Sequence, residues 1–208
     1  MPSTKVAATS TLPTRRNRDA NVMATAIEVM SERGYAATTI QEVADRVGVL
    51  KGSLYHYFSS KEELLFRILE EAHKENLEIV AQVRALELSA IEELLEYLRR
   101  SSAWYLENTD RANIFFTESR HLTGERLEKA RVSGRNYERY VQELITKAQA
   151  EGEVRDDLED RLIARFVLGT VNSIRSWPSR SGKQFGNEVI VESFVELVRS
   201  AIEAAETV

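Results

Sequence analysis

The chain has 208 residues, of which 43% are hydrophobic and 29% charged, a balance typical of a globular protein with one or two domains. It contains no cysteine, which excludes disulfide bonds, thiolate nucleophiles and cysteine-ligated metal sites. Positions 1–61 hold eight basic and five acidic residues, against 20 and 28 in the remainder. A basic segment before an acidic body favours a polyanionic partner for that segment, although solvation of an exposed N-terminus explains the same asymmetry.

The first 14 residues are rich in Ser, Thr, Ala and Pro without periodicity, which predicts a disordered tail. They lack the apolar run of a signal peptide, and no stretch of 18 apolar residues is present to span a membrane. We therefore expect a cytoplasmic protein without a membrane partner. Arg15, Arg16 and Arg18 follow the tail and form either a basic arm for DNA or a solvated helix start.

Helical periodicity continues through the rest of the chain, and no strand pattern interrupts it. The predicted fold class is all-α, with about nine helices. The expected helices lie at about 15–34, 39–47, 51–57, 60–80, 89–108, 110–120, 123–151, 157–176 and 187–204.

Two capping boxes mark helix starts near the N-terminus. Thr39 with Glu42, and Ser60 with Glu63, have the Ser/Thr-x-x-Glu spacing in which each residue satisfies a free backbone N–H of the other. Gly48 ends the first of these helices and leaves a short turn before the next. A helix, a short turn and a second helix, with one helix before and one after, form a helix-turn-helix pattern.

The short helix after the turn contains the crowded run LYHYF, residues 54–58. Leu54 and Phe58 are four residues apart and therefore share the inward face. The Lys, Ser, Tyr and His side chains on the other sides suit phosphate oxygens and base edges, and Gly52 lets the backbone approach a groove closely. Thr39 and Lys61 open the neighbouring helices, where free N–H groups favour phosphate.

Residues 34–64, GYAATTIQEVADRVGVLKGSLYHYFSSKEEL, resemble the DNA-binding domain of the TetR/AcrR family of transcriptional regulators. The resemblance is carried by T-x-x-x-V-A-x-x-V-G-V joined to G-x-L-Y-x-x-F-x-x-K. It implies a homodimer, double-stranded operator DNA with twofold symmetry, and a small-molecule inducer. The expected organisation is the tail at 1–14, a DNA-binding domain at 15–62, and a ligand-binding and dimerisation domain at 63–208, joined through a long helix.

The resemblance also implies roles for individual residues. Phosphate contacts are expected from Thr39, Tyr55, Tyr57 and Lys61, and base-facing positions from Gln41, Lys51, Ser53 and His56, with Gly52 beside them. Leu50 stands where many members have a Ser or Thr cap, so the cap must come from backbone or water. Tyr57 stands where His is usual and has a longer reach. For His56 the alternative is a solvated surface histidine, and for the two tyrosines partial core packing with an exposed hydroxyl.

The C-terminal body offers fewer motifs. Residues 118–177 resemble the ligand domains of TetR-type repressors that respond to acyl-CoA thioesters, which implies phosphate or thioester contacts from Arg120, His121 and Arg175. The alternative is that these side chains pair with neighbouring glutamates, and that the aromatic residues are plain core. The predicted ligand residues are Trp104, Phe115, Phe116, Arg120, His121, Tyr140, Phe166, Asn172, Arg175 and Trp177.

The last two helices are apolar on faces broader than one stripe requires, which predicts a four-helix dimer interface. Dimerisation also follows from the short reach of one recognition helix, because two of them spaced by one DNA turn (~34 Å) multiply specificity. The residues expected at this interface are Val167, Val171, Phe194, Val198 and Ile202.

The expected function is a ligand-responsive DNA-binding regulator without cofactor or metal, most simply a homodimeric repressor. A small hydrophobic effector would release it from a palindromic operator, and the resemblance implies an acyl-CoA thioester of lipid, steroid or aromatic-acid catabolism. A drug-responsive repressor of an efflux pump is the alternative within the same class. A helical-bundle enzyme is disfavoured, because the three histidines have no metal-ligand spacing and no phosphate-binding glycine motif is present. An adaptor that binds another protein predicts that Lys51→Ala, Tyr55→Phe and Lys61→Ala leave partner binding unchanged.

Overall fold

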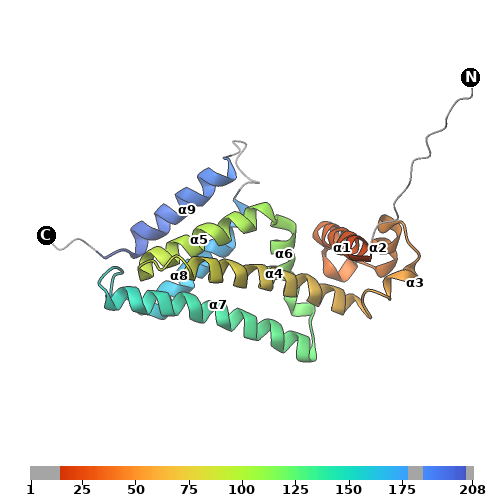
Figure 1. Ribbon diagram of the computed structural model, residues 1–208, viewed down its shortest axis with the longest axis horizontal. Helices are drawn as coiled ribbons and strands as arrows, with labels where there is room; N and C mark the ends of the chain where they lie inside the picture. Colours follow the sequence, from red (N-terminus) through yellow and green to blue (C-terminus); the bar gives the residue numbers. More distant parts are fainter. Residues whose placement is uncertain (1–14, 178–184, 205–208) are drawn as a thin grey trace, which may run out of the picture.

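The structure is a computed structural model that describes residues 15–177 and 185–204. Within these residues it contains nine α-helices and no β-strand, which confirms the predicted all-α class. The predicted tail at 1–14 and the side chains of Arg15, Arg16 and Arg18 lie outside the described residues. The helices labelled in Figure 1 are α1 (Arg15–Ala37), α2 (Ile40–Val47), α3 (Lys51–Leu54), α4 (Lys61–Arg84), α5 (Ala90–Glu107), α6 (Thr109–Glu118), α7 (Gly124–Ala150), α8 (Asp160–Ser173) and α9 (Asn187–Ile202).

The helices form a small unit and a larger body. Helices α1 to α3 form the predicted DNA-binding unit and lie together at one end of the molecule. Helix α4 runs from this unit into the body (Figure 1). In the body, α7 packs against α5 and α8, and α9 packs against α5. Helix α6 contacts both α1 and α4 and so bridges the two parts.

Two clusters of buried apolar side chains stabilise this arrangement, one in each part. The N-terminal cluster includes Leu64 and Ile68 of α4, and also Ile114 of α6. The predicted domain boundary after residue 62 therefore falls at the start of a helix whose first two turns still pack in the DNA-binding unit. A displacement of α4 or α6 therefore moves side chains of the N-terminal cluster, because packed interiors transmit strain.

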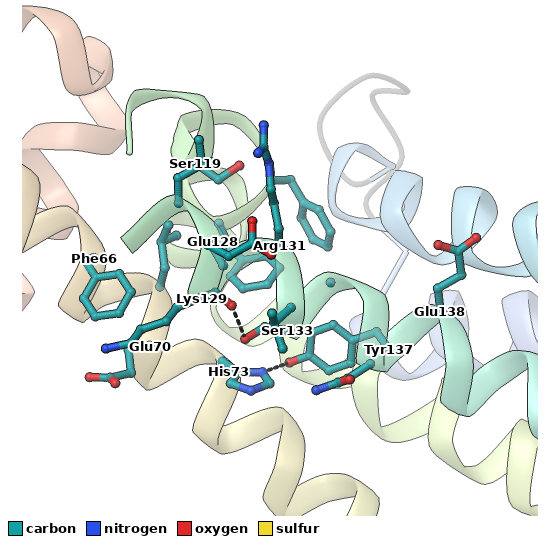
Figure 2. A pocket seen from close by; sticks show the side chains of 18 of the residues that line it. Phe66, Glu70, His73, Ser119, Glu128, Lys129, Arg131, Ser133, Tyr137 and Glu138 are labelled. Carbon is teal, nitrogen blue, oxygen red and sulfur yellow. Dashed lines mark hydrogen bonds between the residues drawn. The ribbon is translucent and has the colours of Figure 1, made fainter. Parts of the chain in front are cut away.

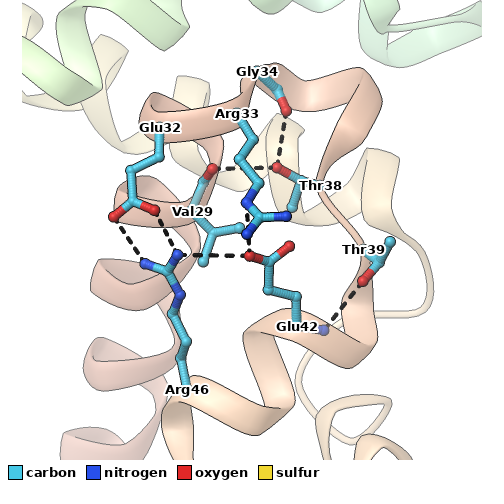
Figure 3. Close-up of polar contacts among 8 residues, drawn as sticks. All are labelled: Val29, Glu32, Arg33, Gly34, Thr38, Thr39, Glu42 and Arg46. Atoms are coloured by element: carbon cyan, nitrogen blue, oxygen red, sulfur yellow. Dashed lines mark hydrogen bonds and ion pairs between the residues drawn. The ribbon is translucent and has the colours of Figure 1, made fainter.

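Contacts between charged side chains join α1 to α2. Thr39 Oγ accepts a hydrogen bond from the backbone N of Glu42 at 3.1 Å, as its predicted capping role requires. The carboxylate of Glu42 does not return to Thr39, so the predicted reciprocal box is wrong in that half; it pairs with Arg33 at 3.0 Å instead. Arg46 forms a two-pronged pair with Glu32 at 2.5 and 2.9 Å (Figure 3). Tertiary ion pairing has replaced the local bond.

The second predicted box is shifted by one residue. Ser60 Oγ accepts from the backbone N of Glu63 at 3.1 Å, but the Glu63 carboxylate accepts from the backbone N of Ser59 at 2.8 Å. The predicted helix 51–57 is also too long, because α3 ends at Leu54 and a turn follows. The predicted recognition element, residues 51–58, is thus one helical turn followed by a loop that backbone hydrogen bonds close.

Candidate DNA-contacting surface and ligand cavity

The side chains of the recognition element sort by direction. Leu54 and Phe58 are buried in the N-terminal cluster, which confirms the prediction that they anchor the element. Lys51 and His56 are exposed, and Tyr55 retains 47% of its accessible surface. The element therefore presents an ammonium, an imidazole and a phenol to solvent, a set of donors that fits phosphate oxygens and base edges.

Leu50 and Tyr57 were expected to depart from the usual family pattern, and both have distinct surroundings. Leu50 precedes α3, supplies no side-chain cap and is 82% exposed. Its carbonyl accepts a hydrogen bond from the backbone N of Ser53 at 2.8 Å, so backbone alone closes the turn. Tyr57 is half-buried against the N-terminal cluster, and its carbonyl accepts from Arg67 at 2.8 Å.

Lys61 is occupied inside the protein. Its ammonium donates to three backbone carbonyls at the end of α1 and just after it, those of Tyr35 (2.9 Å), Ala36 (3.2 Å) and Thr38 (3.0 Å). It also lies 4.4 Å from the centroid of the Tyr35 ring. An ammonium has three N–H donors, so all are used here. In this arrangement Lys61 closes α1 rather than offering a free charge to phosphate.

Thr39 and Gln41 are exposed beside this element. The Oγ of Thr39 already caps α2, and Gln41 Nε2 donates to Asp45 at 2.8 Å. These interactions leave the Thr39 hydroxyl hydrogen and the Gln41 carbonyl oxygen available. With Gly52 and Ser53, both remain predicted DNA contacts.

A cavity of about 740 Å³ lies in the body, within the size range of ligand sites. Helices α4, α5, α6, α7 and α8 all contribute to its wall, and most of its inner surface is aromatic or aliphatic. Rings pack edge to face along one side, with Tyr105 5.4 Å and Phe115 5.2 Å from Phe116 between centroids. The apolar lining consists of Phe66, Leu69, Tyr97, Tyr105, Phe115, Phe116, Leu127, Ala130, Val132, Tyr137 and Leu168.

One polar pair interrupts the apolar lining. His73 Nδ1 and the hydroxyl of Tyr137 lie 2.9 Å apart and join α4 to α7 across the cavity wall (Figure 2). Burial lowers the pKa of His73 and raises that of Tyr137. Both groups are therefore uncharged at neutral pH.

The remaining polar lining comes mostly from the first half of α7. Exposed side chains there include Glu125, Glu128 and Lys129, so the cavity opens to solvent on this side. Glu125 pairs with Lys129 at 2.8 Å, and Glu128 pairs with Arg135 at 2.7 Å. Arg131 has no ion pair among the described residues and supplies an available cation at the mouth.

Three of the ten predicted ligand residues, Phe115, Phe116 and Asn172, line the cavity. Arg175 lies behind this wall, with its guanidinium 4.6 Å from the Phe116 ring and a hydrogen bond to Asn113 at 2.8 Å. Tyr140 is buried in the C-terminal cluster.

The remaining five predicted ligand residues also lie outside the cavity lining, for reasons of tertiary packing. His121 stacks on Tyr35 of the DNA-binding unit at 4.9 Å, and Arg120 beside it is exposed. The indole N–H of Trp104 donates to Glu75 at 2.6 Å. Phe166 and Trp177 are partly exposed and do not belong to the cavity lining.

Several lining residues were not predicted as ligand residues. Phe66, Leu69, Glu70 and His73 follow the spacing i, i+3, i+4, i+7 on α4, which is a second helical stripe beside the buried one. That spacing was the available signal. The charged first half of α7 offers no such signal, because a charged helix face predicts contact with solvent.

The five residues predicted for the dimer interface lie inside the single chain. Val167, Val171, Phe194, Val198 and Ile202 are all buried in the C-terminal cluster of the single chain, because α8 and α9 turn these faces towards α5 and α7. Both helices also carry exposed apolar side chains, namely Leu162 and Phe166 on α8 and Val189 and Leu197 on α9.

The described segments, 15–177 and 185–204, offer neither a cluster of metal ligands nor a membrane-spanning helix. No three acidic or histidine side chains there come together as a metal site. In the same part of the chain, no helix combines the length and hydropathy needed to cross a membrane.

Two family profiles match the chain. The profile described as "Bacterial regulatory proteins, tetR family" matches residues 22–68, and "Tetracyclin repressor-like, C-terminal domain" matches residues 87–202. Together they cover the recognition element and the cavity-bearing body.

Three relatives are similar over almost their whole length. The fatty acid metabolism regulator protein of Bacillus subtilis is 23% identical over 90% of this chain and 97% of its own. The ketosteroid transcriptional regulator KstR2 of Mycobacterium tuberculosis superposes with a TM-score of 0.83 at 23% identity, over 90% and 96% of the two chains. AibR, solved in complex with isovaleryl coenzyme A and operator DNA, has a TM-score of 0.78 at 25% identity, over 86% and 97%.

Proposed function

Because this chain belongs to the TetR family of bacterial transcriptional regulators, we propose that it is a homodimeric repressor released from a palindromic operator by an acyl-CoA thioester. The observation that carries the proposal is one helix with two roles. Helix α4 starts beside the recognition element with Lys61 closing α1, and four residues from Phe66 to His73 line the cavity. A ligand that displaces α4 therefore also displaces the recognition element.

An exposed set of apolar side chains supports the homodimer in this proposal. The exposed apolar residues Leu162 and Phe166 on α8, and Val189 and Leu197 on α9, form a face that is suited to the same face of a second copy. Two copies place two recognition elements on one DNA duplex, and their separation then decides operator affinity.

The cavity supports the effector class. Its aromatic and aliphatic lining suits an acyl group, and Arg131 at the mouth suits a phosphate of a coenzyme A moiety left near solvent. The relatives include a regulator named for fatty acid metabolism and one solved with isovaleryl coenzyme A. These names describe those proteins, and they guide the choice of ligands to test here.

A second effector class has one observation in its favour. Four carboxylates line the cavity, and carboxylates beside aromatic faces suit a lipophilic cation, as a drug-responsive repressor requires. Each of these carboxylates lies within 4 Å of a basic side chain, which reduces its attraction for a ligand cation. The four ion pairs are Glu70–Lys74, Glu125–Lys129, Glu128–Arg135 and Glu138–Arg165.

A thermal-shift screen followed by operator titration tests the proposal. We expect octanoyl-CoA, isovaleryl-CoA or phenylacetyl-CoA to raise Tm where free CoA and octanoate do not, because only binding to the folded state stabilises it. The same compound should weaken binding to a fluorescent fragment from the upstream promoter, and that binding should itself fall steeply with salt. Selective stabilisation by lipophilic cations supports efflux control instead, and absence of DNA binding at low salt contradicts the regulator itself.

A further inference from the structure

The polar pair in the cavity has one unused hydrogen-bond donor. His73 and Tyr137 are both uncharged at neutral pH, because burial opposes a charge on either. If Tyr137 donates to Nδ1, the imidazole proton is on Nε2 and points away from the pair. If Nδ1 donates to the phenol oxygen, the phenol hydrogen is left over. In both tautomers one N–H or O–H has no partner among the described residues.

No described group accepts a hydrogen bond from this free donor, although Glu70 lies near enough to act on the pKa of His73. The two rings meet edge to face at 5.4 Å, and Phe115 lies 6.5 Å from the Tyr137 ring. His73 and Tyr137 are each partly buried within the lining. This donor is therefore open to an acceptor on a bound ligand.

The charge of the lining selects the kind of acceptor. Glu70 lies one turn before His73 on α4, and Glu138 follows Tyr137 directly on α7; both line the cavity. A ligand carboxylate next to His73 would be repelled by Glu70, although the pairing of Glu70 with Lys74 weakens this effect. An uncharged carbonyl oxygen accepts the same hydrogen bond without that repulsion.

We propose that the His73–Tyr137 pair donates a hydrogen bond to an uncharged carbonyl oxygen of the ligand, namely the thioester carbonyl of the acyl-CoA effector. This inference rests on the proposed function and deepens it. The pair then distinguishes a thioester from the free acid released by its hydrolysis, so the regulator responds to the activated form. The apolar lining contributes to affinity but does not distinguish the thioester carbonyl from other groups.

Matched ligands that differ only in the carbonyl test the pair. Octanoyl-CoA and phenylacetyl-CoA are compared by calorimetric titration with the thioethers S-octyl-CoA and S-(2-phenylethyl)-CoA. We expect wild-type protein to bind at least one thioester about 5- to 10-fold more tightly than its thioether, as one hydrogen bond allows. The double variant His73→Phe/Tyr137→Phe keeps both rings and removes both possible donors, so the ratio should fall to about one. Tyr140→Phe, a buried α7 tyrosine outside the lining, should keep the wild-type ratio.

The outcomes separate the inference from the effector class. Equal binding of thioester and thioether by wild-type protein overturns the inference, and this measurement needs no variant to fold. Discrimination that persists in the double variant also overturns it while leaving a CoA-responsive regulator. Tighter binding of octanoate than of octanoyl-CoA overturns both the inference and the proposed effector class. Failure of every CoA compound to bind overturns both this inference and the proposed effector class.

Discussion

The carboxylate of Glu62 accepts hydrogen bonds from the backbone N of Thr123 at 2.7 Å and from its Oγ at 3.0 Å. These bonds lower the pKa of Glu62, so the carboxylate is charged at neutral pH. They join the first turn of α4, next to Lys61, to the start of α7, whose following turns line the cavity. A movement of α7 on ligand binding is therefore transmitted through these bonds to the start of α4 and to the DNA-binding unit.

We expect Glu62→Ala to uncouple the two functions. Binding of octanoyl-CoA, if that is the effector, should change less than about threefold, because Glu62 lies outside the cavity lining. The loss of operator affinity caused by saturating octanoyl-CoA should shrink about fivefold or more, within the usual range of coupling energies. Both are measured by titration, with Glu78→Ala as the control on an exposed part of α4. Full induction in Glu62→Ala argues against this connection.

Leu50 should read a thymine methyl group. An 82% exposed leucine on the recognition surface buries apolar area only when DNA binds, and the C5-methyl of thymine is the apolar feature of the major groove. Replacing single operator thymines by uracil should weaken wild-type binding about fourfold at one or two positions, equivalent to one buried methyl group. Leu50→Ala should abolish that difference. A uracil scan that affects both proteins equally contradicts the assignment.

Lys61 should act through stability rather than through phosphate contact. Lys61→Met removes three hydrogen bonds to backbone carbonyls, and we expect the free energy of unfolding to fall by about 1–2 kcal/mol. The slope of log Kd for operator against log salt should stay at the wild-type value, whereas loss of a phosphate contact lowers it by about one. Lys74→Met is the exposed control on the same helix. A reduced slope restores the predicted phosphate role.

Phe166 should belong to the dimer interface. A glutamate at this half-exposed position places a charge in the apolar face of α8, so Phe166→Glu should give a monomer by light scattering at micromolar concentration. Operator binding should weaken at least about 100-fold, because half-sites are then bound singly. Leu86→Glu changes an exposed leucine in the turn after α4 and should remain dimeric. A dimeric Phe166→Glu protein would falsify this choice of face.

The pH dependence of stability should report His73. Burial is the largest influence on its pKa and lowers it below 6.5, although Glu70 opposes the shift. The unfolded chain therefore binds a proton that the folded state resists, and the free energy of unfolding falls as pH drops below 6.5. His73→Phe should lose this component between pH 7.5 and 5.5 in urea titrations, while Tyr140→Phe keeps it. An unchanged slope in His73→Phe contradicts a neutral buried imidazole.

Local features of the molecule followed from the sequence. The caps at Thr39 and Ser60 and the inward pair Leu54 and Phe58 depend on spacings of three or four residues, which a helix converts into contacts wherever it lies. The same spacings, joined to the family pattern, were enough for the all-α fold and the helix-turn-helix unit.

Only the tertiary structure decided what each helix face meets. Periodicity shows that α8 and α9 are broadly apolar, but the faces chosen for the dimer are buried against α5 and α7, and Phe166 lies on the opposite face. The charged residues at the start of α7 predict a face in contact with solvent, but this segment forms part of the cavity wall. The sequence predicts a phosphate contact for Lys61. In the structure its ammonium donates to carbonyls at the end of α1 and just after it, 23 to 26 residues earlier. A residue's neighbours along the chain determine its helix and its stripe, whereas its partners depend on how separate helices pack, which no local spacing specifies.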